Sequence, residues 1–161
     1  HHSQGARVNL AQLNEGQGDL AAAERLFREA IASGHPVEVP RASVLLGFLL
    51  QSQGDENGAL HLWESAAESE AEEWSPRGAL GAGHIHYERG QYEQAASHFS
   101  TVSQLRDPNQ AAGAYYFLGL CQARLGDLAA AHSALEKTVE FGDPDLRAKA
   151  MQLLAVGGSS G

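Results

Sequence analysis

The chain returns to glycine at a fixed interval of 36 residues, at Gly18, Gly54, Gly90 and Gly126. The six letters GDLAAA begin at both the first and the last of these glycines. Alanines follow each glycine after five residues and large apolar residues follow after nine, an offset of four that keeps both on one face of a helix. The members of these two sets are Ala23, Ala59, Ala95 and Ala131, then Phe27, Trp63, Phe99 and Leu135. A period of this length with helical spacing predicts an array of helical hairpins.

The repeated glycines are expected to end the first helix of each hairpin, because glycine adopts a left-handed backbone conformation without a steric cost. Asp19, Asp55 and Asp127 follow three of them, where a carboxylate can cap the next helix. Gln91 takes the fourth position and is a weaker cap. Seven residues before the glycines lie small residues that would allow a second helix to approach closely: Ala11, Gly47, Gly83 and Gly119.

The spacing predicts an all-α chain, and no window alternates polar and apolar residues for long enough to indicate a strand. The predicted helices are 6–16, 19–33, 39–52, 55–70, 76–89, 91–104, 109–125, 127–140 and 145–156. Residues 1–5 are interpreted as a tag remnant and linker, because the chain begins with His1 and His2. Residues 157–161 are interpreted as a flexible tail.

This pattern resembles the tetratricopeptide repeat, in residues such as Leu118-Gly119, Gly126, Ala131 and Leu135. The resemblance covers about residues 6–156 and implies a right-handed superhelical solenoid of antiparallel helix hairpins. It places repeats at about 4–39, 40–75, 76–111 and 112–144, followed by a terminal helix, 145–156. The family period is about 34 residues, so two extra residues are expected to lengthen the loops between hairpins. Glu56 stands where repeat two should have a large apolar residue, which predicts a locally weaker hairpin.

Net charge, apolar run length and the placement of cysteine and histidine argue against several functions. A formal net charge of −9 is unfavourable for wrapping a nucleic-acid backbone, and no apolar run approaches the length of a membrane helix. Cys121 is the single cysteine and lies on an apolar helical stretch, which favours a buried filler over a nucleophile. His84 and His86 are two residues apart and would point to different faces of a helix. We therefore predict no catalysis, no metal site and no cofactor.

The resemblance implies that a concave wall, built chiefly from the first helices, faces solvent and binds a partner. The residues carried over to this wall are Asn9, Gln12, Arg41, Val44, Leu45, Phe48, Gln51, Arg77, Leu80, His84, Tyr87, Glu88, Tyr116, Phe117, Leu120, Arg124 and Lys149. The chaperone-adaptor type of this family grips a C-terminal carboxylate with set groove residues. Of the matching positions here, only Arg77 has a suitable side chain, so such a clamp is not expected.

Four aromatic residues fall in these groove phases, and exposed aromatic surface with a polar rim is typical of binding sites: Phe48, Tyr87, Tyr116 and Phe117. Each could instead be core packing. Arg41, Arg77 and Lys149 share one phase of the repeat and could bind acidic groups of a partner, or could pair with glutamates of adjacent helices.

The sequence therefore predicts a non-catalytic module that binds a peptide or helix of a partner protein with apolar anchors and acidic groups. The alternative is a self-assembling or regulatory scaffold segment of a larger protein, packing through terminal helices with exposed apolar faces. A small-molecule sensor has no specific support. The acidic run 64–74 is a secondary candidate for docking a basic partner. Arginine outnumbers lysine nine to two, which is typical of a GC-rich genome, and we expect a bacterial source. No signal-peptide pattern is visible, and we expect a cytoplasmic protein.

Overall fold

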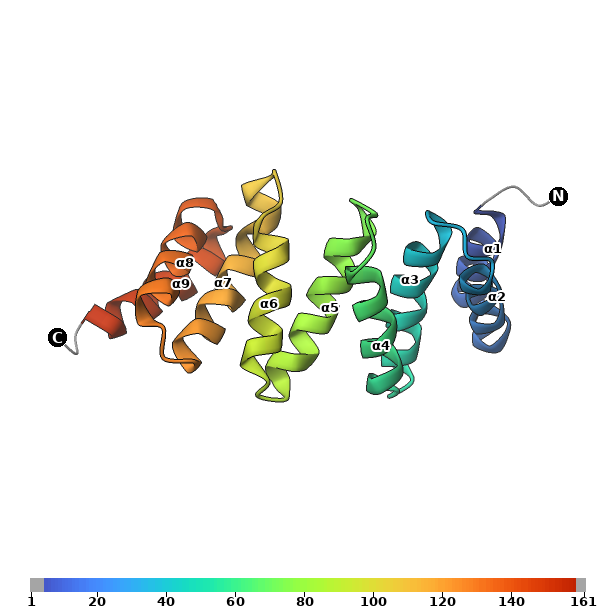
Figure 1. Ribbon diagram of the computed structural model, residues 1–161, viewed down its shortest axis with the longest axis horizontal. Coiled ribbons are helices and arrows are strands. Elements are labelled where there is room, and N and C mark those ends of the chain that lie inside the picture. The colour runs from blue at the N-terminus through green and yellow to red at the C-terminus, as the bar shows by residue number, and fades with distance from the viewer. Residues whose placement is uncertain (1–4, 159–161) are drawn as a thin grey trace. The chain divides into compact units, whose positions relative to one another are not determined.

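The computed structural model describes residues 5–158, apart from the side chains of residues 108–110 and 158. Helices alternate with short turns and longer loops along this part of the chain (Figure 1). They are α1 (Ala6–Gly16), α2 (Leu20–Ala32), α3 (Glu38–Ser52), α4 (Glu56–Ala67), α5 (Trp74–Glu88), α6 (Tyr92–Ser103), α7 (Pro108–Arg124), α8 (Leu128–Phe141) and α9 (Pro144–Gly158). The described residues contain no strand, and the predicted all-α class is confirmed.

The predicted helix boundaries agree with the structure to within three residues at every end. The largest difference is at the end of α4, which is Ala67 where the sequence predicted residue 70. The prediction of a tail beginning at Gly157 is wrong for two residues, since α9 continues to Gly158. The predicted tag remnant at His1 and His2, and the last three residues of the tail, lie outside the described residues.

The chain forms two compact units, residues 1–82 and 83–161, which divide within α5. In the first unit, α1 packs against α2, α2 against α3, and α3 against α4. In the second unit, α6, α7, α8 and α9 pack in the same successive manner. Each unit is therefore built from helices that contact their neighbours in sequence, as repeat proteins are.

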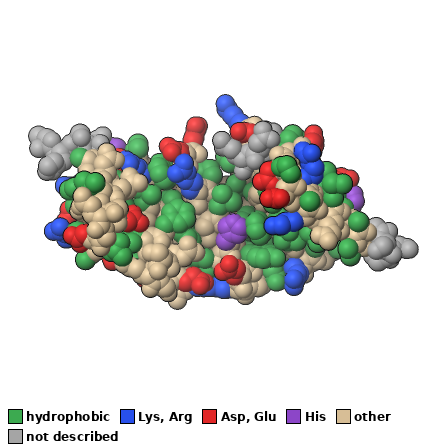
Figure 2. Space-filling view, turned by 180° about the vertical axis from the view of Figure 1, so that it is seen from behind, with side chains coloured by type: hydrophobic (Ala, Val, Ile, Leu, Met, Phe, Trp, Pro, Cys, Tyr) green, Lys and Arg blue, Asp and Glu red, His purple; other side chains and the backbone are tan. Residues whose placement is uncertain are grey.

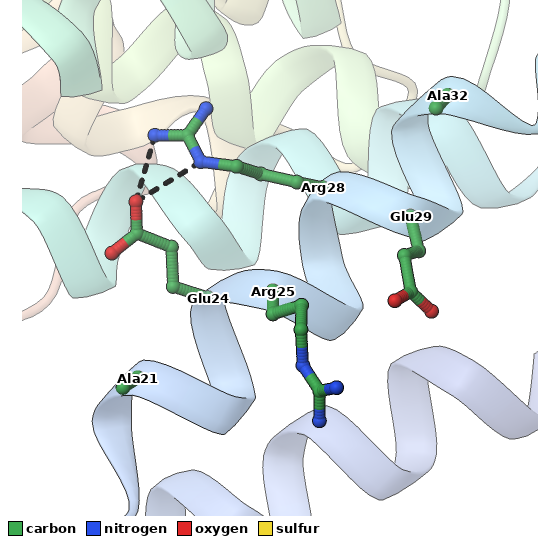
Figure 3. A pocket seen from close by; sticks show the side chains of 6 residues that line it. All are labelled: Ala21, Glu24, Arg25, Arg28, Glu29 and Ala32. Atoms are coloured by element: carbon green, nitrogen blue, oxygen red, sulfur yellow. Dashed lines mark hydrogen bonds and ion pairs between the residues drawn. The ribbon is translucent and has the colours of Figure 1, made fainter.

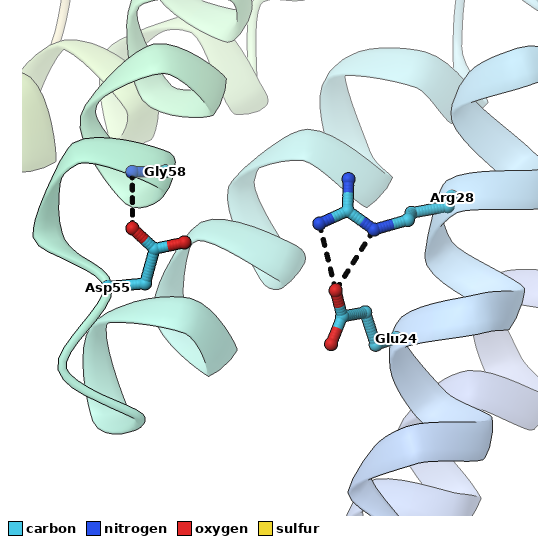
Figure 4. A network of polar contacts seen from close by, with 4 residues as sticks. All are labelled: Glu24, Arg28, Asp55 and Gly58. Carbon is cyan, nitrogen blue, oxygen red and sulfur yellow. Dashed lines mark hydrogen bonds and ion pairs between the residues drawn. The ribbon is translucent and has the colours of Figure 1, made fainter.

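The turns inside the hairpins confirm the roles predicted for the repeated residues. All four repeated glycines have positive φ, between 73° at Gly90 and 87° at Gly126. The carboxylate of Asp55 accepts a hydrogen bond of 2.9 Å from the backbone N–H of Gly58 (Figure 4). Asp19 and Asp127 cap α2 and α8 in the same way. Gln91 makes no cap, and its Oε1 instead lies 2.7 Å from Nδ1 of His86.

The repeat positions with large apolar residues form the core of both units. Phe27 and Trp63 are buried in the first unit, and Phe99 and Leu135 in the second. Cys121 is also fully buried, as its apolar helix predicts. Among the described residues, no helix is long and apolar enough to cross a membrane.

Glu56 does not occupy a core position. It is exposed at the start of α4, and Leu128 at the equivalent place in α8 is 70% exposed. The equivalent Tyr92 of α6 is half-buried and its ring contacts Tyr87, which a glutamate side chain does not reproduce, so the weaker hairpin stays a prediction.

Candidate functional site

Four aromatic rings of the second unit contact the ring of Phe117 on α7. We call these five residues the Phe117 cluster: His84, Tyr87, Phe99, Tyr116 and Phe117. The centroid of the Phe117 ring lies 4.5 Å from that of His84 and 5.3 Å from that of Tyr116, both edge to face. It lies 5.7 Å from the Tyr87 ring and stacks on Phe99 at 5.4 Å. These spacings are those of stable aromatic pairs.

The Phe117 cluster has a buried base and a partly open top. Phe99 on α6 is fully buried, whereas His84, Tyr87, Tyr116 and Phe117 keep part of their surface accessible to solvent. Three of the four open rings come from the positions predicted for aromatic groove contacts. The fourth, His84, belongs to the same predicted wall. The structure therefore brings four of the predicted site residues of the second unit together on one surface.

Charges and partial burial set the protonation of this surface. Burial lowers the pKa of His84, and the nearby carboxylate of Glu88 opposes that shift. The imidazole is thus neutral at pH 7. Burial also raises the pKa of Tyr87, against the lowering effect of the Arg124 guanidinium. Both rings therefore present neutral, amphipathic edges to a ligand.

Tyr92 and Arg124 lie at the edge of the Phe117 cluster, and their mutual contact was not predicted from the sequence. Tyr92, at the start of α6, contacts Tyr87 with ring centroids 5.7 Å apart. The guanidinium of Arg124 lies 5.6 Å above the Tyr92 ring, within the range of a cation–π contact. Tyr92 is separated from Tyr87 by the hairpin turn, so helical spacing alone could not show the contact. Arg124 adds a positive charge beside an otherwise neutral surface.

In the first unit, Arg41 on α3 links two predicted site residues of α1. Its Nη2 donates a hydrogen bond of 2.7 Å to Oδ1 of Asn9 and another of 3.1 Å to Oε1 of Gln12. The structure thus brings Asn9, Gln12 and Arg41 together as one exposed polar group. These two bonds use the N–H donors of Nη2, and the three N–H donors on Nη1 and Nε lie outside them.

Phe48 and Val44, both predicted for the same wall, have opposite environments. Phe48 is 49% exposed and packs edge to face on the buried Trp63, with ring centroids 5.1 Å apart. Val44 is completely buried and cannot line an open surface. The prediction that Val44 lines the binding wall is therefore wrong. Its side chain belongs to the core, and its own backbone carbonyl accepts a hydrogen bond from Nε1 of Trp63.

The remaining predicted residues show mixed exposure. Leu80 and Leu120 are half-buried, and Lys149 is exposed. Arg77 is exposed, and its guanidinium lies 4.6 Å above the Trp74 ring and 3.5 Å from the carboxylate of Glu73. Glu73 immediately precedes α5, the helix that carries Arg77, so this pair is local, and pairing with glutamates of adjacent helices stays a prediction.

The first unit also has a shallow hollow on the surface of α2 (Figure 3). Its lining residues all belong to this helix: Ala21, Glu24, Arg25, Arg28, Glu29 and Ala32. Arg28 and Glu24 form an ion pair of 2.8 Å there. No second helix contributes a lining side chain, so nothing converges on a ligand. On the face seen in Figure 2, by contrast, hydrophobic side chains reach the surface in several places between charged ones.

The fold and these surfaces define an all-α repeat protein with open aromatic and polar groups on its first helices. Two family models, both described as tetratricopeptide repeat, match residues 80–145 and 5–34. The chain therefore belongs to the tetratricopeptide repeat family.

No curated protein sequence shows significant similarity to the chain. Among solved structures, the chain is similar to YrrB, described as a TPR protein with an unusual peptide-binding site. The TM-score is 0.67 at 20% sequence identity, over 93% of this chain and 75% of that one. At this identity the likeness supports the fold of a repeat array. The fold and family are those of a protein-interaction module.

Proposed function

We propose that the protein is a non-catalytic interaction module. It binds a peptide or helix of a partner protein on the first helix of each hairpin, namely α1, α3, α5 and α7. The observation that supports the proposal is the Phe117 cluster, whose partly exposed rings form an aromatic surface in the second unit. Tyrosines at such a surface add contact area at a low cost in side-chain entropy. The peptide-binding site named for YrrB, a protein of similar fold, supports the same reading.

The partner that suits this surface has an apolar anchor and an acidic group close to it. The anchor would pack on Phe117 and on Tyr87 and Tyr116, which are half-buried and both contact the Phe117 ring. The acidic group would meet Arg124, which is exposed beside the Tyr92 ring. In the first unit, Phe48 offers a second apolar contact and Arg41 a second positive charge. A cytoplasmic location and the absence of a cofactor remain part of this proposal.

The second candidate function is self-assembly through the terminal helix. Three apolar side chains of α9 are strongly exposed: Met151 at 54%, Leu153 at 37% and Val156 at 66%. Exposed faces of terminal repeat helices stack on further helices in repeat proteins. A molecular mass in solution that stays monomeric over a hundredfold range of concentration would exclude this function.

The interaction module is tested with Tyr116→Ala, because Tyr116 contributes to the open side of the cluster without belonging to the buried core. The adjacent Tyr115 provides a matched control, since it is equally half-buried but its ring faces Lys137 at 5.5 Å. Proteins captured from a lysate of the source organism by the wild type and by Tyr115→Ala should be absent with Tyr116→Ala. The partner so identified is then titrated by calorimetry.

We expect Tyr116→Ala to weaken binding about 10- to 100-fold, as for an aromatic residue in the centre of an interface. Phe117→Ala is a poorer first test, because Phe117 also stacks on the buried Phe99 and its loss would disturb the core. Equal affinity of the Tyr115 and Tyr116 variants, with circular dichroism unchanged in both, would overturn the proposal.

A further inference from the structure

The first unit contains a hollow of about 730 Å³ between two loops. One side is formed by the loop from α2 to α3, and the other by the loop from α4 to α5. Both loops lie at the upper ends of their helices in Figure 1. We call this the loop hollow and define it by its lining residues: Ile31, Gly34, Pro36, Val37, Val39, Pro40, Ser69, Glu70, Ala71, Glu72, Glu73 and Trp74.

The two loops are built alike, because they stand one 36-residue period apart. The hydroxyls of Ser33 and Ser69 each donate a hydrogen bond of 2.6 Å to the carbonyl three residues earlier, at Ala30 and Ala66. After each serine, backbone hydrogen bonds lead the chain into the next helix, such as that from Ser75 N–H to the Ala71 carbonyl at 2.8 Å. These bonds hold both walls in place before a ligand arrives, which lowers the entropic cost of binding.

The surface of the loop hollow combines apolar and acidic side chains. Val37 is 59% exposed, and the Trp74 ring is half-buried, so both offer apolar surface to a ligand. Glu70 and Glu72 are exposed, and no lysine, arginine or histidine occurs among the lining residues, all of which are described. Glu73 is the one lining carboxylate with an ion-pair partner, Arg77 at 3.5 Å, which lies over the Trp74 ring.

We propose that the loop hollow binds a basic segment of a partner protein, in which an apolar side chain stands next to arginine or lysine. The apolar side chain would contact Val37 and Trp74, and the cationic group would meet Glu70 and Glu72. The carboxylates alone would not define a site. Together with a preformed hollow of a size typical of ligand sites, they select the charge of the occupant, and a cation is the complementary choice. This chemistry is opposite to that proposed for the Phe117 cluster, so the two surfaces do not compete for one peptide.

The test uses two capped hexapeptides with the whole chain labelled with ¹⁵N. The basic probe is acetyl-Gly-Leu-Arg-Leu-Arg-Gly-amide, and the acidic probe carries glutamate in place of arginine. The chain has two tryptophans, and only Trp74 lines the hollow, whereas the Trp63 indole is buried and bonded to Val44. The basic probe should shift the indole N–H resonance of Trp74 and leave that of Trp63 unmoved. The acidic probe should shift neither.

Two variants separate a local site from general attraction to a negative protein. Glu70→Gln/Glu72→Gln should weaken binding of the basic probe about 3- to 10-fold, the range for two exposed charge pairs. Glu93→Gln/Glu136→Gln makes the same change in net charge at exposed residues of the second unit and should have less than a twofold effect. Val37→Ser should weaken binding without a change in helicity, because the side chain is mostly exposed.

The proposal is overturned if saturating basic probe leaves the Trp74 resonance unmoved, or if the two double variants weaken binding equally. It is also overturned if sedimentation shows a dimer that Val37→Ser dissociates, since a second copy would then occupy the hollow. Tyr116→Ala should bind the basic probe as the wild type does. This result keeps the loop hollow distinct from the Phe117 cluster, so failure of one proposal does not imply failure of the other.

Discussion

The indole ring of Trp63 lies directly against the backbone of Gly47, in the place that a side chain would need. A Cβ built on Gly47 would overlap the Nε1 atom of Trp63, which donates a hydrogen bond of 3.1 Å to the Val44 carbonyl. A Cβ at Gly81 would lie 2.5 Å from the fused part of the same ring. Glycines on α3 and α5 thus enclose the largest buried side chain of the first unit.

Gly47→Ala is therefore expected to destabilise the first unit. Overpacking a core typically costs about 1–3 kcal/mol, and the better helix propensity of alanine returns at most about 1 kcal/mol. The free energy of unfolding, measured in urea by far-UV circular dichroism, should fall by the difference between these two contributions.

Gly113→Ala on α7 is the matched control, because nothing lies within 4 Å of a Cβ built there. Only the propensity effect remains, so the variant should gain up to about 1 kcal/mol. A stable Gly47→Ala protein would show that the ring can move away from α3 at little cost.

Asp127→Ala should destabilise α8 through loss of its cap. The carboxylate accepts a hydrogen bond of 3.1 Å from the Ala130 N–H, and an N-cap exchanged for alanine typically costs about 1 kcal/mol. Asp127→Asn retains a side-chain acceptor and should stay close to the wild type in thermal unfolding. If asparagine were as harmful as alanine, the carboxylate charge would matter more than the hydrogen bond.

The parts of the fold that could be predicted from the sequence are those that depend on short-range rules. Glycine with positive φ and aspartate at the cap act within a few residues, so a regular period locates every hairpin turn. Gln91 was correctly predicted as a weaker cap from side-chain chemistry. Its alternative contact with His86 could not be predicted, because it depends on the orientation of the preceding helix.

The sequence could predict the helical face on which each candidate site residue lies, but not whether that residue is exposed. Val44 and Phe48 lie four residues apart on one face of α3, yet one is completely buried and the other half exposed. Burial depends on which neighbouring elements pack against each position, and helical spacing carries no information on that packing. Likewise, Arg41 binds Asn9 over a separation of 32 residues, which no local pattern indicates.

Cys121 is expected to resist thiol reagents in the folded protein. Burial raises the pKa of its thiol to about 11, and the side chain has no exposed surface. Since the thiolate is the reactive form, labelling by a maleimide at pH 8 should be slow in buffer and fast in denaturing urea. Rapid labelling without denaturant would mean that α7 opens locally under native conditions.

His84 should make stability depend on pH on the acid side of neutrality. Burial lowers its pKa in the folded state, whereas the unfolded chain retains a value near 6.5. The unfolded state therefore binds more protons as the pH falls below about 6.5, and the free energy of unfolding decreases through that range. The full stabilisation from the neutral ring is present above it.

His84→Gln should reduce this decline between pH 7 and pH 5, measured as the urea midpoint at each pH. The same replacement at the exposed His61 is the control and should retain the wild-type slope. Wild-type stability that instead rises toward pH 5 would contradict this prediction. That result would mean that the carboxylate of Glu88 outweighs burial and that the folded protein prefers the imidazolium.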